Sequence, residues 1–74
     1  MRYIENMKYN IEVEQETDGR WIAEIGDLPG VMAYGETRDQ AIGAVQALAL
    51  RVVADRIEHG EVLPAQIEIT FQPA

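Results

Sequence analysis

Cysteine is absent from this chain of 74 residues, and histidine occurs only once, as His59. This scarcity excludes Cys–His catalytic pairs and zinc sites built from these side chains. The six glycines match neither the Walker spacing nor the dinucleotide-binding fingerprint. We therefore predict no catalytic residue and no cofactor. His59 is interpreted as a side chain of a helix's last turn, where an imidazolium favours the helix dipole.

Basic residues are also scarce, since 6 Lys and Arg stand against 13 Asp and Glu, a net charge of −7. Affinity for nucleic acid depends largely on phosphate neutralisation by Lys and Arg, so direct nucleic-acid binding is not expected. Two interpretations of the acidity stay open: it attracts a basic protein partner, or it only keeps a small protein in solution.

No segment has the character of a membrane span or a signal peptide. The apolar run over 41–54 is shorter than the roughly 20 residues required and contains Gln46 and Arg51. Residues 1–6 lack the apolar core of a signal peptide. With no disulfide framework either, the sequence favours the cytoplasm and no membrane partner. Its length and its 47% hydrophobic residues indicate one globular domain, 1–74, near the size at which association adds stability.

Two strands joined by a tight hairpin are predicted in the first third of the chain. Apolar and polar residues alternate over 7–13, and apolar residues alternate again at Trp21, Ala23 and Ile25. A three-residue loop, Thr17–Gly19, places both apolar sets on one face, with Gly19 left-handed in a G1 bulge. In that register the expected pairs are Val13 with Ala23 and Ile11 with Ile25.

A corner and a helix start follow the hairpin at fixed offsets. Pro29 fixes its own φ and Gly30 accepts a positive φ, so a tight corner is predicted before a third strand over 31–35. Thr37 is predicted to be the N-cap of a helix. Gln40 lies three residues later, where its side chain can complete a capping box by accepting from the cap's N–H.

The helix is expected to end at Glu58 or His59, with Gly60 as its C′ residue. After Pro64 a final strand is predicted from the alternation of Ile67, Ile69 and Phe71. The fold class is therefore α+β, a two-layer β-β-β-α-β arrangement with a mainly antiparallel sheet and one long helix on one face. Residues 1–6 precede the strand pattern and are interpreted as a short disordered extension, with Met7 as an alternative start.

The order of these features is similar to that of a known family. An Asp-Gly turn at 18–19, an aromatic at Trp21, Asp-Leu-Pro-Gly at 27–30, Gly-Glu-Thr at 35–37 and an alanine-rich helix follow one another. This ordered set, over about 7–64, resembles the HicB-like antitoxin family. The resemblance implies part of a ribonuclease-H-like fold. It also implies a partner, a small basic mRNA-cleaving toxin of HicA type with a double-stranded-RNA-binding-like fold and an active-site histidine.

One departure from the family pattern bears on function. Many HicB-like antitoxins carry a second, C-terminal DNA-binding domain, whereas the present sequence stops at Ala74, soon after the last predicted strand. We therefore expect no operator binding without a partner.

Carboxylates gather on one side of the predicted hairpin. In the expected register Glu12 lies opposite Glu24, away from the Trp21 side, with Glu14 one step along. Three interpretations compete: a solvated outer face, a binding patch for a basic protein, and a divalent-metal site of ribonuclease H type. No equivalent of the ribonuclease H catalytic acids is visible, so no metal site is predicted. The three glutamates are our candidate partner-binding residues.

The predicted helix has two apolar stripes. One suits the sheet and consists of Ala41, Ile42, Val45, Leu48, Ala49 and Val52. The other lies on the opposite side and consists of Gly43, Ala47, Leu50 and Ala54. A single sheet covers only one of them, so the second predicts an oligomer or partner interface. The alternative is that these small residues are merely tolerated on a helix surface.

The sequence thus leads to two main functional hypotheses. The first is a non-enzymatic antitoxin-like protein, as the resemblance implies, which binds and neutralises a HicA-type toxin. The second is a stand-alone, homo-oligomeric interaction or scaffold domain without a toxin. A third, magnesium-dependent hydrolysis of ribonuclease H type that would depend on Glu12 or Glu24, is not expected.

Overall fold

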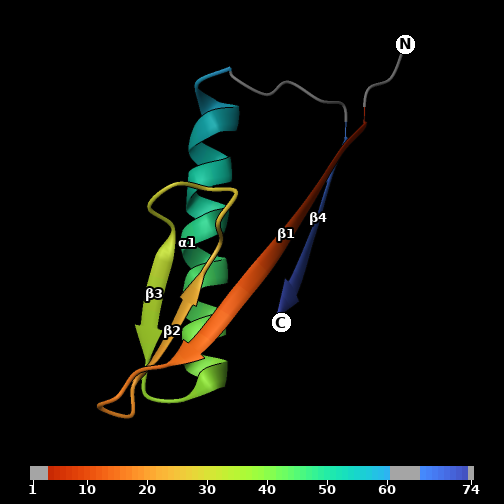
Figure 1. Ribbon diagram of the computed structural model, residues 1–74. Helices are drawn as coiled ribbons and strands as arrows, with labels where there is room; N and C mark the ends of the chain where they lie inside the picture. Colours follow the sequence, from red (N-terminus) through yellow and green to blue (C-terminus); the bar gives the residue numbers. More distant parts are fainter. Residues whose placement is uncertain (1–3, 61–65, 74) are drawn as a thin grey trace.

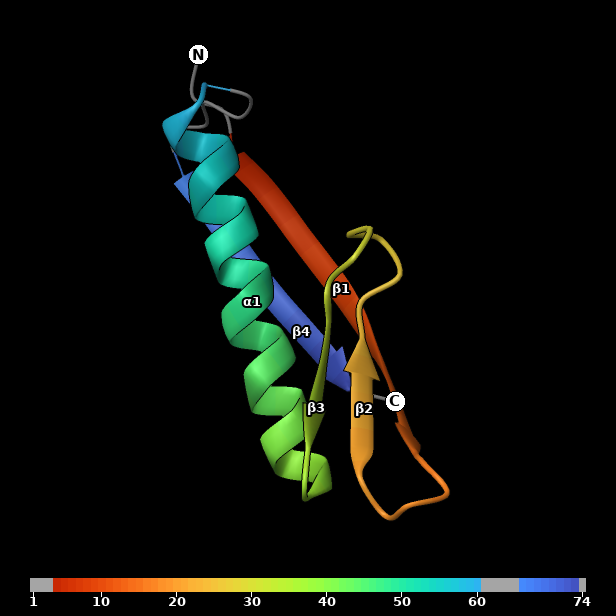
Figure 2. The ribbon, with the colours of Figure 1, turned by 90° about the vertical axis from the view of Figure 1, so that its left-hand side faces the viewer.

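The structure, a computed structural model, describes residues 4–60 and 66–73 and confirms the α+β fold class. Its elements are β1 (Ile4–Gln15), β2 (Trp21–Glu24), β3 (Met32–Gly35), α1 (Arg38–Glu58) and β4 (Gln66–Pro73). The four strands form one sheet in the order β3-β2-β1-β4, and α1 lies on one face of it (Figures 1 and 2). The β1–β2 and β2–β3 pairs are antiparallel, whereas β4 runs parallel to β1.

β1 is 12 residues long, and its first and last parts pair with different strands. Residues 12–15 pair with β2, and residues 4–11 pair with β4, so the molecule is elongated, 51 × 21 × 16 Å. Residues 4–6 lie opposite 66–68 in this parallel ladder. The disordered extension expected over 1–6 is therefore wrong for these three residues, because β4 supplies them with backbone partners. Residues 1–3 lie outside the described part of the chain.

The hairpin between β1 and β2 has the predicted three-residue loop. The Gly19 N–H donates to the Glu16 carbonyl at 3.0 Å, and the Glu16 N–H donates to the Arg20 carbonyl at 2.7 Å. Gly19 has a φ of +92°, as a G1 bulge requires. This turn places Val13 opposite Ala23, so the predicted register is confirmed.

The β1–β2 ladder is shorter than expected and ends at the pair of Glu12 and Glu24. The Ile25 N–H lies on the β3 side of its strand and donates to the Val31 carbonyl at 3.0 Å. The chain then turns at the predicted corner, where the Val31 N–H donates to the Leu28 carbonyl and Gly30 has a φ of +80°. A positive φ at the third position is typical of a type II turn. β3 begins one residue later than predicted, at Met32.

Both ends of α1 are capped by the residues that the sequence indicates. The Thr37 Oγ1 accepts from the Gln40 N–H at 3.1 Å. The Gln40 Oε1 accepts from the Glu36 N–H at 3.1 Å, so the side chain reaches one residue beyond the cap that the capping box predicts. At the other end Gly60 has a φ of +75° and its N–H donates to the Ile57 carbonyl at 3.1 Å, as expected for C′.

The core lies between α1 and the face of the sheet formed by β2, β3 and residues 7–13 of β1, with Ile69 and Phe71 of β4 packed against it. Of the predicted sheet-facing stripe, Leu48 and Val52 are only half-buried, and Val53, outside that stripe, is buried. The buried residues of the core are Tyr9, Ile11, Ala23, Ile25, Leu28, Val31, Ala41, Ile42, Val45, Ala49 and Val53. No described helix is both long and apolar enough to cross a membrane.

Gly35, the last residue of β3, lies very close to the backbone of the first turn of α1, so a substitution at this position tests the packing directly. A Cβ built on Gly35 would fall against the backbone nitrogen of Ala41 and lie 2.9 Å from the backbone carbonyl carbon of Gln40. Gly35→Ala is therefore expected to lower the free energy of unfolding by about 1–3 kcal/mol, measured by urea denaturation. Gly26→Ala is the control, because a Cβ there meets nothing within 4 Å. Equal effects of the two substitutions would contradict the close approach.

Candidate functional site

The outer face of the sheet, on the side away from α1, brings the three predicted glutamates together. Glu12 lies directly opposite Glu24, and Glu14 lies opposite Ile22, so the predicted placement is confirmed. All three carboxylates are exposed, and with Ile22 they line a shallow surface pocket. Within residues 4–60 and 66–73 none of the three forms an ion pair. We call Glu12, Glu14 and Glu24 the acidic patch.

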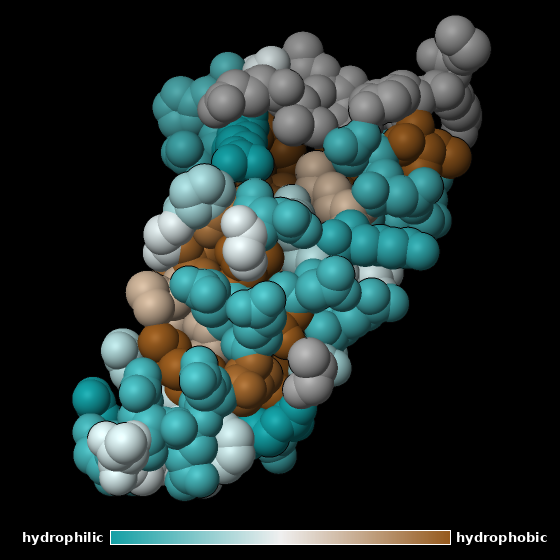
Figure 3. All heavy atoms as spheres, in the orientation of Figure 1, coloured by the Kyte–Doolittle hydropathy of each residue, from teal (hydrophilic) through white to brown (hydrophobic). Residues whose placement is uncertain are grey.

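Apolar side chains from β2 and β3 lie beside the acidic patch, and the sequence reasoning did not include them. Met32 lies opposite Glu24 and is 41% exposed, while Tyr34 lies opposite Ile22 and is 49% exposed. Figure 3 views the molecule from this side and shows apolar surface enclosed by hydrophilic residues over β2 and β3. The period of the third strand places Met32 and Tyr34 on one common face, but only the pairing of β3 with β2 makes this the face of the acidic patch.

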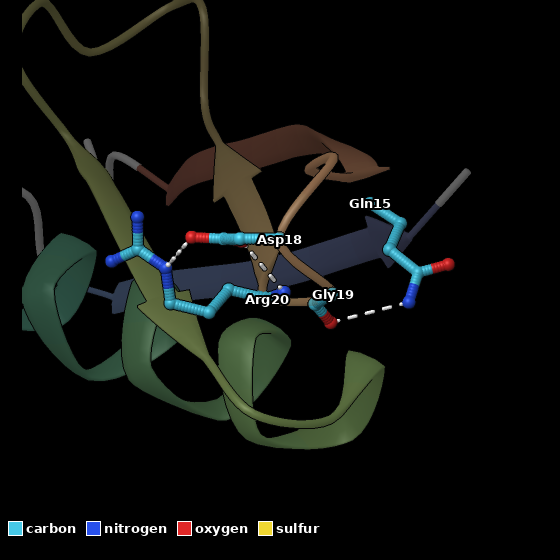
Figure 4. A network of polar contacts seen from close by, with 4 residues as sticks. All are labelled: Gln15, Asp18, Gly19 and Arg20. Atoms are coloured by element: carbon cyan, nitrogen blue, oxygen red, sulfur yellow. Dashed lines mark hydrogen bonds and ion pairs between the residues drawn. The ribbon is translucent and has the colours of Figure 1, made fainter.

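In the hairpin turn next to the acidic patch, Arg20 is held in an internal network, shown in Figure 4. The Arg20 Nε donates to the Asp18 Oδ2 at 2.8 Å, and the Arg20 backbone N–H donates to the Asp18 Oδ1 at 3.0 Å. The Arg20 guanidinium lies 4.7 Å from the centroid of the Tyr34 ring, a cation–π arrangement. Arg20 is therefore oriented toward its own turn and toward Tyr34.

His59, the single histidine, lies at the end of α1. Its Nδ1 is 2.7 Å from the Asp55 carbonyl oxygen and 3.3 Å from the Asp55 Oδ1, and both side chains are exposed. These contacts fit the structural role expected at a helix C-terminus. Across the described ranges no group of three or more His, Asp or Glu side chains is placed to hold a metal ion, and no polar side chain is buried.

The outer side of α1 is the second candidate surface. Gly43, Ala47, Leu50 and Ala54 are all exposed, and Leu50 is 46% exposed. The helix therefore presents this apolar stripe to solvent, opposite the side that packs on the sheet. Nothing in the structure tests whether another chain covers it.

The turn network generates a pH prediction. The Arg20 backbone N–H, followed by its guanidinium, lowers the pKa of Asp18 from its ordinary value of 3.8. A lowered pKa means that the ionised carboxylate supports the fold above pH 3.8, and this support is lost as the pH falls through the lowered value. We expect carboxyl NMR titration to find the Asp18 pKa below 3.8. In Arg20→Gln the pKa should rise only part of the way, because the backbone donor remains. Titration of wild-type Asp18 at its ordinary pKa would contradict the network.

No protein-family model, curated protein or solved structure matches the chain. The resemblance to HicB-like antitoxins, and with it the likeness to part of a ribonuclease H fold, therefore stays a prediction from the sequence.

Proposed function

We propose that this chain is a non-catalytic, antitoxin-like protein that binds a small basic toxin of HicA type on the outer face of its sheet and masks it. The observation that supports the proposal most directly is the acidic patch, three exposed carboxylates on two paired strands. Glu12 and Glu24 repel each other across the ladder, which disfavours the isolated fold slightly. A cationic partner would replace that repulsion with attraction.

The neighbours of the acidic patch suit a protein partner better than a small ion. Tyr and Met are enriched at the centres of protein interfaces, and here Tyr34 and Met32 are both exposed beside the carboxylates. Charges at the rim of such a surface steer a partner of opposite sign and raise the association rate. A basic ribonuclease, which must itself bind phosphates, has the required charge. We place this encounter in the cytoplasm, with no direct nucleic-acid contact by this chain.

The acidic patch predicts how a toxin would associate. Replacing Glu12, Glu14 and Glu24 together with Gln should slow association with a HicA-type protein about tenfold at low ionic strength and flatten its salt dependence. The melting temperature should stay the same or rise, since the repulsion between Glu12 and Glu24 is removed. Stopped-flow binding at two salt concentrations and a thermal melt measure these effects.

The matched control changes the net charge by the same amount elsewhere, with Asp27→Asn, Asp55→Asn and Glu58→Gln. If the control slows association as much as the patch variant, only net charge matters. An unchanged association rate in the patch variant would mean that the three glutamates form only a solvated face of the sheet.

A second candidate function is a homo-oligomeric interaction domain without a toxin, and the exposed stripe of α1 favours it. Small residues at Gly43 and Ala47 would let a second helix approach closely, with Leu50 as the apolar contact. In this case the chain would assemble through its helix layer and leave the sheet face free.

Ala47→Glu tests the helix interface. It should leave the fold intact, because position 47 is exposed, and should weaken self-association about tenfold or more by burying an unpaired charge. Ala44→Glu, the same change at an exposed position outside the stripe, is the control. Sedimentation velocity measures both. A wild-type protein that is monomeric at high micromolar concentration would rule out this interface.

A further inference from the structure

The free edge of β4 is a surface that neither proposed function uses. β4 is the last strand in the order β3-β2-β1-β4, and its outer edge pairs with no strand in the described part of the chain. Along residues 4–11 β1 pairs only with β4, since the β2 ladder starts at Glu12. Figure 1 shows this parallel pair running away from β2 and β3. A two-stranded piece of sheet is marginal by itself, whereas three or more strands are stable.

The side chains of β4 lack the usual protection of an edge strand. Its residues alternate, with Ile67, Ile69 and Phe71 half-buried on the side of the core and Gln66, Glu68, Thr70 and Gln72 exposed. Natural edges avoid pairing through lysines, prolines or bulges, but β4 carries a single charge, at Glu68, and its proline is its last residue. β3, the other edge strand, carries no charge but is only 4 residues long, whereas β4 offers 8 residues with a single charge, and very short edge strands pair poorly.

We propose that β4 pairs antiparallel with β4 of a second copy of this chain, about a twofold axis that passes midway between the two copies of Ile69. The four strands of each copy then join into one continuous sheet across the axis. The pair of strands β1 and β4 gains two more strands at its open side. The contact is self-complementary, as a twofold interface must be.

Two features of β4 favour this register over registers shifted by one or two residues: the alternation of its apolar and polar side chains, and the position of its single charge. Centring on Ile69 places Ile67 opposite Phe71 and Glu68 opposite Thr70, so apolar residues meet on one face and no like charges meet. A shift of one residue in the pairing would set apolar against polar side chains. Centring on Glu68 would place that carboxylate opposite its own copy, and centring on Thr70 would place Ile67 opposite Pro73, which has no N–H to donate.

An introduced cysteine tests the axis directly, because the chain has none of its own and any disulfide must join two copies. Ile69→Cys should form a covalent dimer under mild oxidation, since directly opposite Cα atoms lie about 4.5–5.5 Å apart. Ile67→Cys is the matched control, half-buried on the same strand face. In the proposed register its two copies lie on the order of 13 Å apart, too far for a disulfide.

A charge pair provides a second test without a covalent bond. Thr70→Lys would face Glu68 of the partner and tighten the dimer, whereas Thr70→Glu would face the same carboxylate and weaken it. Two symmetric pairs change, so the dissociation constants of the two variants should differ by about tenfold in sedimentation equilibrium.

The fold of the single chain responds in the opposite direction, which separates the two effects. Thr70 lies beside Lys8 of β1, so Thr70→Glu gains an attraction within the chain and Thr70→Lys gains a repulsion. The chain's own Glu68, two residues away on the same face, acts against this effect from about 7 Å, so a thermal melt of each variant measures the change in the single chain directly.

The proposal would be overturned by a wild-type chain that stays monomeric at high micromolar concentration, by equal cross-linking of Ile67→Cys and Ile69→Cys, or by a tighter dimer for Thr70→Glu. The toxin-binding proposal does not depend on these outcomes, because the acidic patch lies on β1 and β2. Self-association lost in Ala47→Glu but unchanged in both Thr70 variants would assign the dimer to α1 instead and also reject the β4 edge.

Discussion

The register between β1 and β2 is the constraint on which the rest of the structure depends. The turn that contains Gly19 sets it, and Gly19 adopts a φ of +92° without the strain that a side chain would add. A slip of one residue would move Ile11 and Ala23 from the core to solvent and carry the glutamates into the apolar layer. One turn therefore decides both where the core lies and on which face the acidic patch is displayed.

β1 pairs with β2 along one part of its length and with β4 along the other, and this divides the sheet into two unequal parts. Residues 12–15 belong to a three-stranded part of the sheet, whereas residues 4–11 pair only with β4, although Tyr9 and Ile11 among them are buried in the core. Tyr9 and Phe71, with ring centroids 6.0 Å apart, link the two strands near the point where the two parts meet. Both parts contribute side chains to the core, but in the described part of the chain the two-stranded part also offers backbone donors and acceptors along its edges. Binding through an edge would thus stabilise the part of the sheet that needs it most.

The acidic patch does little for the stability of the isolated chain. Opposed carboxylates disfavour the strand pair that carries them, and Arg20, in the turn next to the acidic patch, is engaged with Asp18 and Tyr34 instead. The combination of this charge with exposed Tyr34 and Met32 is the reason that we propose a protein partner for this surface. The same reasoning sets the β4 edge apart, because its attraction to a second copy would come from backbone pairing and apolar contact rather than from charge.

Local signals in the sequence were sufficient to predict the turn at Gly19, the cap at Thr37, the helix end at Gly60 and the placement of Glu12 opposite Glu24. Each depends on bonds between near neighbours or on the period of a single strand, which a sequence shows directly. Only the tertiary structure decided that β4 runs parallel to β1, that β1 begins as early as Ile4, and that Tyr34 and Met32 join the acidic face. The alternation of Ile67, Ile69 and Phe71 is the same whichever strand lies beside it and in whichever direction. Contacts between the two ends of the chain choose among these arrangements, and their energy comes from packing that no local pattern contains.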